Sequence, residues 1–249
     1  MGRLKVIRTI CAIGLLLTVG GIASGVSVES GGQASLGYTI TPLPAGAADY
    51  QHTHAEAGFD IATGTPVSVV DDYSLPNSEA FAETSHSWGR ATGDTAADLL
   101  GAANYASAGG SALQSWGYAS TVHRVEFTLD AEQTIDIAYA FDAVTWVDSS
   151  STAGSGFSVA LAAIAIDGGL VYDSDPDWDD YVAVTGIGYE EKTLSDSGTI
   201  SQLLAPGPHQ VAFFLDTYEN AIVPEPLTML GVFGGVAGLT GYLRRRGRY

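Results

Sequence analysis

The chain has 249 residues and a formal net charge of −18, from 28 acidic and 10 basic residues. Residues 26–222 hold 27 of the acids but only three basic residues, which gives this part a formal charge of −24. Such a surface repels nucleic acid and anionic lipid headgroups, and it suits divalent cations or a polysaccharide matrix bridged by them. The alternative is that the charge serves solubility alone.

Residues 1–25 have the three parts of a secretory signal peptide. The basic start, the apolar run and the small-residue exit are Arg3, Lys5 and Arg8, then 10–19, then 20–25. The small-residue exit disfavours the alternative, an uncleaved N-terminal anchor. The one cysteine, Cys11, lies inside this leader, so the mature domain has no thiol and its fold depends on core burial rather than disulfides.

An early strand is predicted in the lead-in at 26–65. Leu36, Tyr38 and Ile40 alternate with small or polar residues, which is typical of a strand with one buried face. Two prolines, Pro42 and Pro44, then end it.

His52 and His54 stand two residues apart. If this stretch is a strand, both side chains lie on the same face, because side chains alternate between faces. Two imidazoles at that spacing can share a metal ion, although local spacing fixes no third ligand. The alternative is an ordinary pair of surface histidines in a loop.

Residues 66–120 give weaker signals. Strands are predicted at 66–70, ended by Asp71 and Asp72, and at 81–88. The Ala-rich stretch 95–108 fits a helix capped by Asp94, or else one arm of a hairpin that turns near Gly109. Scattered Gly, Ser and Thr residues favour strands or irregular structure there over the helix.

Period-two alternation is clearest after residue 120. One strand places Val125, Phe127 and Leu129 on one face, and after a turn the next places Ile135, Ile137, Tyr139 and Phe141 on one face. The nearly all-apolar stretch 157–166 is expected to have both faces covered. Further strands are predicted at 170–172 (after a Gly168–Gly169 turn), at 181–187, and through Val211, Phe213 and Leu215.

This pattern of short strands separated by Gly, Ser, Asp and Pro turns predicts an all-β fold. The expected architecture is one antiparallel β-sandwich over 26–222, jelly-roll-like in connectivity.

Five carboxylates occur within eight residues between two of these strands, at Asp173, Asp175, Asp177, Asp179 and Asp180. Alternating acids in a turn can converge on Ca²⁺, which prefers six to eight oxygen ligands. The stretch is not an EF-hand loop, because its sixth position is not Gly and its twelfth is Val184. The alternative is a solvated acidic turn.

Three aromatic residues, Tyr172, Trp178 and Tyr181, lie in or beside the acidic loop. Exposed aromatic rings stack on sugars in carbohydrate-binding sandwiches, so these residues are candidates for sugar binding by analogy of fold. The alternative is that the rings belong to the core.

No motif combines a nucleophile, a base and an orienting residue. Gly154-Ser155-Gly156 has the wrong spacing for a nucleophile elbow, and paired acids such as Glu190-Glu191 point to opposite faces of a strand. The chain is therefore not expected to be an enzyme, and a secreted hydrolase is the minor alternative.

The C-terminal 27 residues have three parts in a fixed order. Val223-Pro224-Glu225-Pro226 is followed by an uncharged apolar run at 227–243, and then by Arg244, Arg245, Arg246 and Arg248. At about 1.5 Å per residue the run makes a helix of roughly 25 Å, the short limit for a bilayer span. The arginines hold the C-terminus on the cytoplasmic side.

This order resembles the PEP-CTERM sorting signal of exported bacterial proteins, and the resemblance covers this tail alone. It implies export, temporary anchoring in the inner membrane, and recognition by an exosortase that cuts near the PEP motif and releases the protein to the surface or matrix. The alternative is an ordinary tail anchor.

The resemblance implies a structural or adhesive role for the chain in an extracellular polysaccharide layer. A calcium-assisted carbohydrate-binding module is the first rival role, based on the acidic loop.

Overall fold

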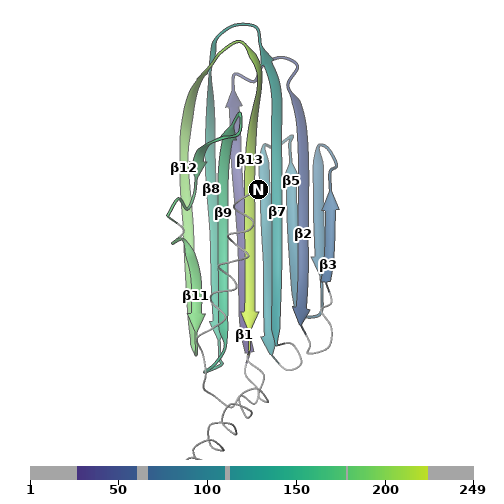
Figure 1. The fold of residues 1–249 in the computed structure, drawn as a ribbon, viewed down its shortest axis with the longest axis vertical. Helices are drawn as coiled ribbons and strands as arrows, with labels where there is room; N and C mark the ends of the chain where they lie inside the picture. The colour runs from purple at the N-terminus through teal and green to yellow at the C-terminus, as the bar shows by residue number, and fades with distance from the viewer. Residues whose placement is uncertain (1–26, 61–66, 110–112, 178, 224–249) are drawn as a thin grey trace, which may run out of the picture.

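The computed structural model describes residues 27–60, 67–109, 113–177 and 179–223. These residues form two antiparallel sheets in an elongated sandwich (Figure 1), which confirms the all-β class. The expected signal peptide and the membrane span at 227–243 lie outside this part of the chain. Among the described residues, no helix is long and apolar enough to cross a membrane.

One sheet has six strands in the order β12-β8-β1-β6-β5-β4. Their bounds are Gly188–Leu204 for β12, Gln133–Ser149 for β8, Ser27–Thr41 for β1, Leu99–Gly109 for β6, Ser87–Asp94 for β5 and Asn77–Glu83 for β4. The first strand, β1, lies in the middle of this sheet. At about 3.3 Å per residue, the 17 residues of β8 span roughly 55 Å, which accounts for the elongated shape.

The other sheet has seven strands, in the order β10-β9-β13-β7-β2-β3, with β11 also pairing with β9. Their bounds are Gly169–Asp173 for β10, Ser155–Ile166 for β9, Gly207–Ile222 for β13, Gln114–Leu129 for β7, Ala48–Asp60 for β2, Val67–Asp72 for β3 and Tyr181–Thr185 for β11. The last strand, β13, lies between β9 and β7. The first and last strands of the sandwich, β1 and β13, are therefore both interior strands of their sheets (Figure 1).

Two expectations for the stretch 66–120 are wrong. No hairpin turns near Gly109, because the described strands on either side of it, β6 and β7, lie in different sheets. The strand predicted at 81–88 is interrupted, because β4 ends at Glu83 and the Thr84 N–H donates to the Ser87 carbonyl (2.8 Å) in a turn. The preference for a strand over a helix at 95–108 is confirmed by β6. Asp94 does act as a cap, since its Oδ1 accepts from the N–H groups of Ala96 and Ala97 (2.9 and 3.1 Å), but it caps a turn that leads into β6.

Strand β12 is not predicted by the sequence. It is an edge strand that pairs only with β8, and its side chains are mostly exposed Ser, Thr, Asp and Glu. Leu194 and Ile200 alone among its middle residues pack partly against the core. A strand that buries so little shows no clear alternation of apolar and polar residues.

Period-two alternation correctly predicts which side chains form the core. The predicted faces of β7, β8 and β13 all point inward, and Phe141 and Phe213 are among the largest fully buried side chains. Tyr38 of β1 stacks on Phe213 of the opposite sheet, with ring centroids 3.7 Å apart. Strand β9 buries one face fully and the other only partly, so the expectation that both its faces are covered is half right.

Toward β2, β4 and β5 the two sheets approach each other closely. Their facing side chains are small and fully buried: Ala55, Ala57, Ala80, Ala82, Ala91 and Ala119. A Cβ on Gly89 of β5 would lie 2.3 Å from the Tyr118 carbonyl oxygen and 2.9 Å from that of Glu56, both in the opposite sheet. The sheets here meet through backbone, which only glycine permits.

Glu219 of β13 is a fully buried acid between the sheets. Neither carboxylate oxygen has a hydrogen-bond partner in the described part of the chain, and the nearby Ser158 hydroxyl donates to the Gly31 carbonyl (3.1 Å). Gly32 on the facing strand leaves room for it, because a Cβ there would lie 2.4 Å from Glu219 Oε1. Burial raises the pKa of Glu219 well above its ordinary value.

Glu219→Gln is expected to stabilise the fold at neutral pH but not near pH 4. The pKa of Glu219 is higher in the folded state than in the unfolded chain. As pH rises above about 4.3, the Glu219 carboxyl therefore ionises in the unfolded chain but stays protonated in the folded protein. This favours the unfolded chain, so the free energy of unfolding of the wild type falls with rising pH. Gln does not ionise and avoids this loss. In thermal unfolding, Glu219→Gln should raise the melting temperature by a few degrees at pH 7 and leave it unchanged at pH 4. Each kcal/mol of stability corresponds to on the order of 2–4 °C.

The control is Glu190→Gln, at an exposed site on β12. Parallel pH profiles of melting temperature for the wild type and Glu219→Gln would contradict the prediction.

Both ends of the described chain lie at one pole of the sandwich. The Ser27 N–H donates to the Ser150 hydroxyl (3.0 Å), and the Val223 N–H donates to the Leu113 carbonyl (2.7 Å). Val28 and Val223 belong to the same small apolar cluster. Val223 is only 7% exposed, because its side chain packs in the sandwich.

Candidate metal centre

His52 and His54 lie on the outer face of the seven-stranded sheet, and they share one face of a strand as their spacing predicts. Both are on β2, whose alternate residues Gln51, Thr53 and Ala55 point inward and are buried. The imidazole side chains remain 27% and 20% exposed. The strand therefore holds both rings on one face in reach of solvent.

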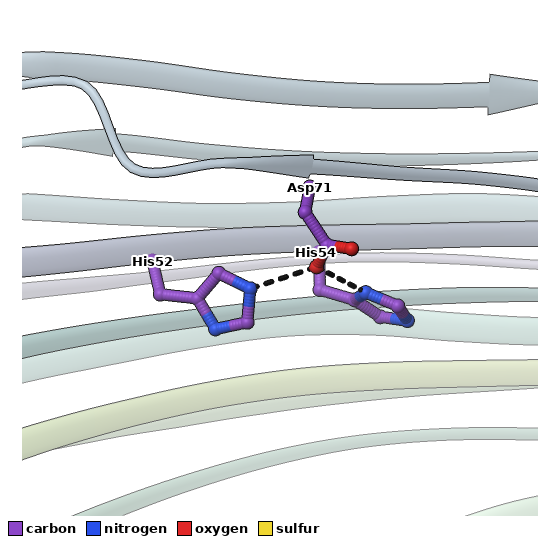
Figure 2. Close-up of side chains that lie close together, drawn as sticks. All are labelled: His52, His54 and Asp71. Carbon is purple, nitrogen blue, oxygen red and sulfur yellow. Dashed lines mark hydrogen bonds and ion pairs between the residues drawn. The ribbon is translucent and has the colours of Figure 1, made fainter.

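The third residue of the group is Asp71, from the neighbouring edge strand β3. The antiparallel register places it directly opposite His54. His52 Nε2 lies 2.8 Å and His54 Nδ1 2.7 Å from the same oxygen, Asp71 Oδ1. Figure 2 shows the two rings converging on this oxygen. The ligand atoms of the three residues all lie within 4.8 Å of one another.

Two further residues orient the histidines. Tyr73 stacks on His52, with centroids 4.4 Å apart and an interplanar angle of 4°. Glu56 Oε1 lies 3.0 Å from His54 Nε2, on the side of the ring away from Asp71. A carboxylate on the second nitrogen of an imidazole is the usual outer-sphere partner of a metal-bound histidine, because it fixes the ring and raises its basicity.

The hydrogen bonding of His54 explains how a metal ion would fit. Both ring nitrogens face carboxylates, so the ring donates to both only when it carries two protons. A metal ion on Nδ1 would take the place of one proton and leave Nε2–H to donate to Glu56. Before a metal binds, hydrogen bonds from His52 and His54 lower the pKa of Asp71 and hold its carboxylate ionised.

The donor set is two imidazole nitrogens and one carboxylate oxygen. Such a set suits Zn²⁺ and other divalent transition metals, whereas Ca²⁺ and Mg²⁺ prefer oxygen ligands alone. The half-exposed position leaves room for water or an outside group to complete the coordination.

The sequence misses Asp71, although it is the residue that makes this group. Asp71 and Asp72 read as residues that end a strand, yet both belong to β3. The missing information is the register between β2 and β3, which brings a residue 17 positions away opposite His54. An acidic residue near the end of the next predicted strand is the only sequence signal.

The acidic loop brings together three of its five carboxylates, Asp175, Asp179 and Asp180. Asp175 is 2% exposed and accepts from the backbone N–H groups of Asp179 and Asp180 (2.9 and 3.2 Å). Lys192 Nζ lies 2.6 Å from Asp180 Oδ1. Backbone donors and a lysine thus already stabilise these negative charges, and a cation would have to share Asp180 with Lys192.

The loop aromatics do not form one surface. Tyr172 packs on the inner side of the sheet against Tyr139, with centroids 4.2 Å apart, and it contacts the core. Tyr181 is 44% exposed on the outer side, beside Phe157. The two rings lie on opposite faces of the sheet, so Tyr172 and Tyr181 cannot stack on one sugar chain. Trp178 lies outside the described residues.

Of the expected sorting motif, only Val223 is among the described residues. Pro224, Glu225, Pro226 and the four arginines at 244–246 and 248 lie outside that part of the chain.

No protein-family model matches the chain, and no curated protein is similar to it. Among solved structures, a GH31 α-xylosidase from Xanthomonas citri is 10% identical over 63% of this chain, with a TM-score of 0.11, and the chain spans 35% of that protein. The vicilin of Solanum melongena is 6% identical, with a TM-score of 0.10, over 79% of this chain and 70% of the vicilin. Similarities this weak carry no argument about fold or function.

Proposed function

We propose that this protein is an exported bacterial surface or extracellular-matrix protein with a structural or adhesive role, sorted by its PEP-CTERM tail. The observation that carries the proposal is the order of PEP motif, apolar run and arginines in the last 27 residues. In this proposal the leader is removed, the tail anchors the chain in the inner membrane, and an exosortase then releases the sandwich into a polysaccharide layer.

Two features of the sandwich support this role. Ser27 and Val223 lie at one pole, so a leader and a tail attached to them would both start from that pole and leave the rest of the sandwich clear of a membrane. The acidic, cysteine-free domain also suits an extracellular layer, because it folds without disulfides and stays soluble.

Glu225→Ala is expected to block processing of the tail and leave the unprocessed chain in the inner membrane. The fold should be unaffected, because the last strand, β13, ends at Ile222, before the motif. Fractionation of host cells and immunoblotting against the sandwich would measure the distribution. Glu190→Ala, which removes an exposed carboxylate from strand β12 of the sandwich, is the control. Normal release of Glu225→Ala would refute the sorting role of this motif.

A second function that we propose is binding of a divalent transition metal at His52, His54 and Asp71. The observation that favours it is the convergence of two imidazole nitrogens on one carboxylate oxygen. Calcium binding by the acidic loop does not enter this proposal, because Lys192 already neutralises Asp180. No observation favours the secreted hydrolase.

We also propose a jelly-roll-like connectivity for the sandwich, since the chain crosses repeatedly from one sheet to the other, as in β1 to β2, β3 to β4 and β12 to β13. The meander β4-β5-β6 within one sheet departs from the simplest form of that fold. An experimental structure in which most consecutive strands are neighbours in one sheet would contradict this.

A further inference from the structure

An aromatic row crosses the outer face of the six-stranded sheet. It contains one aromatic residue from every strand except β1: Phe81 of β4, Trp88 of β5, Tyr105 of β6, Trp146 of β8 and Tyr189 of β12. Direct register pairs join Trp88 to Tyr105 and Tyr105 to Gly31, and Gly31 is opposite Trp146. Phe81 and Tyr189 extend the row by diagonal neighbours. With five interstrand spacings of about 4.8 Å, the row is roughly 24 Å long.

Gly31 of β1 closes the gap in this row. A Cβ on Gly31 would lie 2.6 Å from Cε2 and Cζ2 of Trp146, so the indole lies against the glycine backbone. From there the Trp146 ring reaches Tyr105 across β1, with centroids 6.2 Å apart and planes tilted by 47°. The glycine thus lets the Trp146 ring lie across β1 toward Tyr105, where the Cβ of any other residue would lift the ring.

The aromatic row is accessible to solvent. Phe81 and Tyr189 at its two ends are 46% and 61% exposed, and the three central rings are half-buried, as expected of rings that lie along a sheet. A large exposed aromatic surface on a water-soluble domain usually marks a binding site.

The charges beside the aromatic row restrict what it binds. Glu83, Glu191 and Asp148 stand opposite Trp88, Trp146 and Tyr189 in the sheet register. Arg90, which stands opposite Phe81 in the register, is paired with Glu79 (2.8 Å). Anionic polymers, anionic lipid surfaces and a second copy of the same face would all be repelled. A neutral ligand with many hydroxyl groups would instead donate hydrogen bonds to these carboxylates.

We propose that the aromatic row binds a neutral polysaccharide chain lying across the strands. Sugar rings present C–H groups that pack on the negative faces of aromatic rings, while their hydroxyls reach the flanking carboxylates. This surface is separate from Tyr172 and Tyr181, which belong to strands β10 and β11 of the other sheet. The inference names a polysaccharide partner for the proposed matrix role and rests on that role for its biological setting.

Isothermal titration of the full chain with cellohexaose and with maltohexaose tests the inference. The protein is purified in a detergent without a sugar headgroup, which would otherwise compete. The two probes present a flat and a helically twisted neutral chain. Binding of either one supports the inference and identifies the preferred chain shape, and Trp146→Ala should weaken that binding by at least about tenfold.

The matched control is Trp116→Ala. Trp116 is a half-buried indole that also lies over a glycine, Gly58, but on the outer face of the other sheet. It should leave binding unchanged. If Trp146→Ala fails to fold, Trp88→Ala takes its place. Failure of both hexasaccharides to bind, or equal losses in Trp116→Ala and the row variants, would overturn the inference. Because the titration does not depend on processing of the tail, either result leaves the sorting proposal to its own test.

Discussion

Gly89→Ala is expected to lower the free energy of unfolding by about 3 kcal/mol or more, at the upper end of overpacking effects. The added Cβ would lie 2.3 Å from the Tyr118 carbonyl oxygen. Backbone on a paired central strand cannot move aside as a flexible side chain does, so the two sheets must separate. Thermal and urea unfolding followed by circular dichroism would measure the loss.

Gly37→Ala is the matched control for Gly89→Ala. Gly37 is also a strand glycine, on β1, but the nearest atom to its added Cβ is 4.0 Å away. This variant should be neutral or slightly stabilising, because Ala restricts the unfolded chain more than Gly does. Equal stability of the two variants would show that the sheets are not in backbone contact near β5.

The double variant His52→Ala, His54→Ala is expected to abolish Zn²⁺ binding. Removal of both nitrogen ligands leaves Asp71 alone, so we expect affinity to fall by well over the 10–100-fold typical of an outer-sphere change. At a Zn²⁺ concentration 100 times the dissociation constant, the wild type gains about 2.7 kcal/mol of stability and the variant should gain none. Thermal unfolding with and without Zn²⁺ measures both effects.

His86→Ala controls for loss of a histidine elsewhere. His86 lies in the turn between β4 and β5, and its ring contacts Phe59 rather than a carboxylate. Its response to Zn²⁺ should match that of the wild type.

Zn²⁺ binding by the wild type should also weaken as pH falls, because protons compete with the metal for the imidazole nitrogens. A Zn²⁺ shift that survives the double variant would contradict the metal centre.

The sequence predicts the fold best where one face of a strand is buried. The alternation through Ile135, Ile137 and Phe141, or through Val211, Phe213 and Leu215, identifies both the strand and its inner face. It fails for β12, whose exposed edge position imposes no apolar alternation, and for 81–88, where a tight turn at Thr84 divides an apparently continuous strand.

The candidate sites are less predictable because they depend on register. The spacing of His52 and His54 predicts two ligands on one face, but only the pairing of β2 with β3 supplies Asp71. The aromatic row is likewise assembled from five strands, and no two of its members are neighbours in sequence. The acidic loop is the opposite case, because its five carboxylates are obvious in the sequence but do not need a metal ion. Backbone N–H groups and Lys192 already bind Asp175 and Asp180.

Intact mass spectrometry of the protein recovered from the envelope and matrix of its own host tests the proposed function most directly. The sorting proposal predicts a mature chain that begins near residue 26 and ends near the PEP motif at 224–226, found outside the inner membrane. A chain that keeps the apolar run and the arginines at 244–248 would contradict release by an exosortase. It would make this sandwich a permanently anchored domain at the membrane surface.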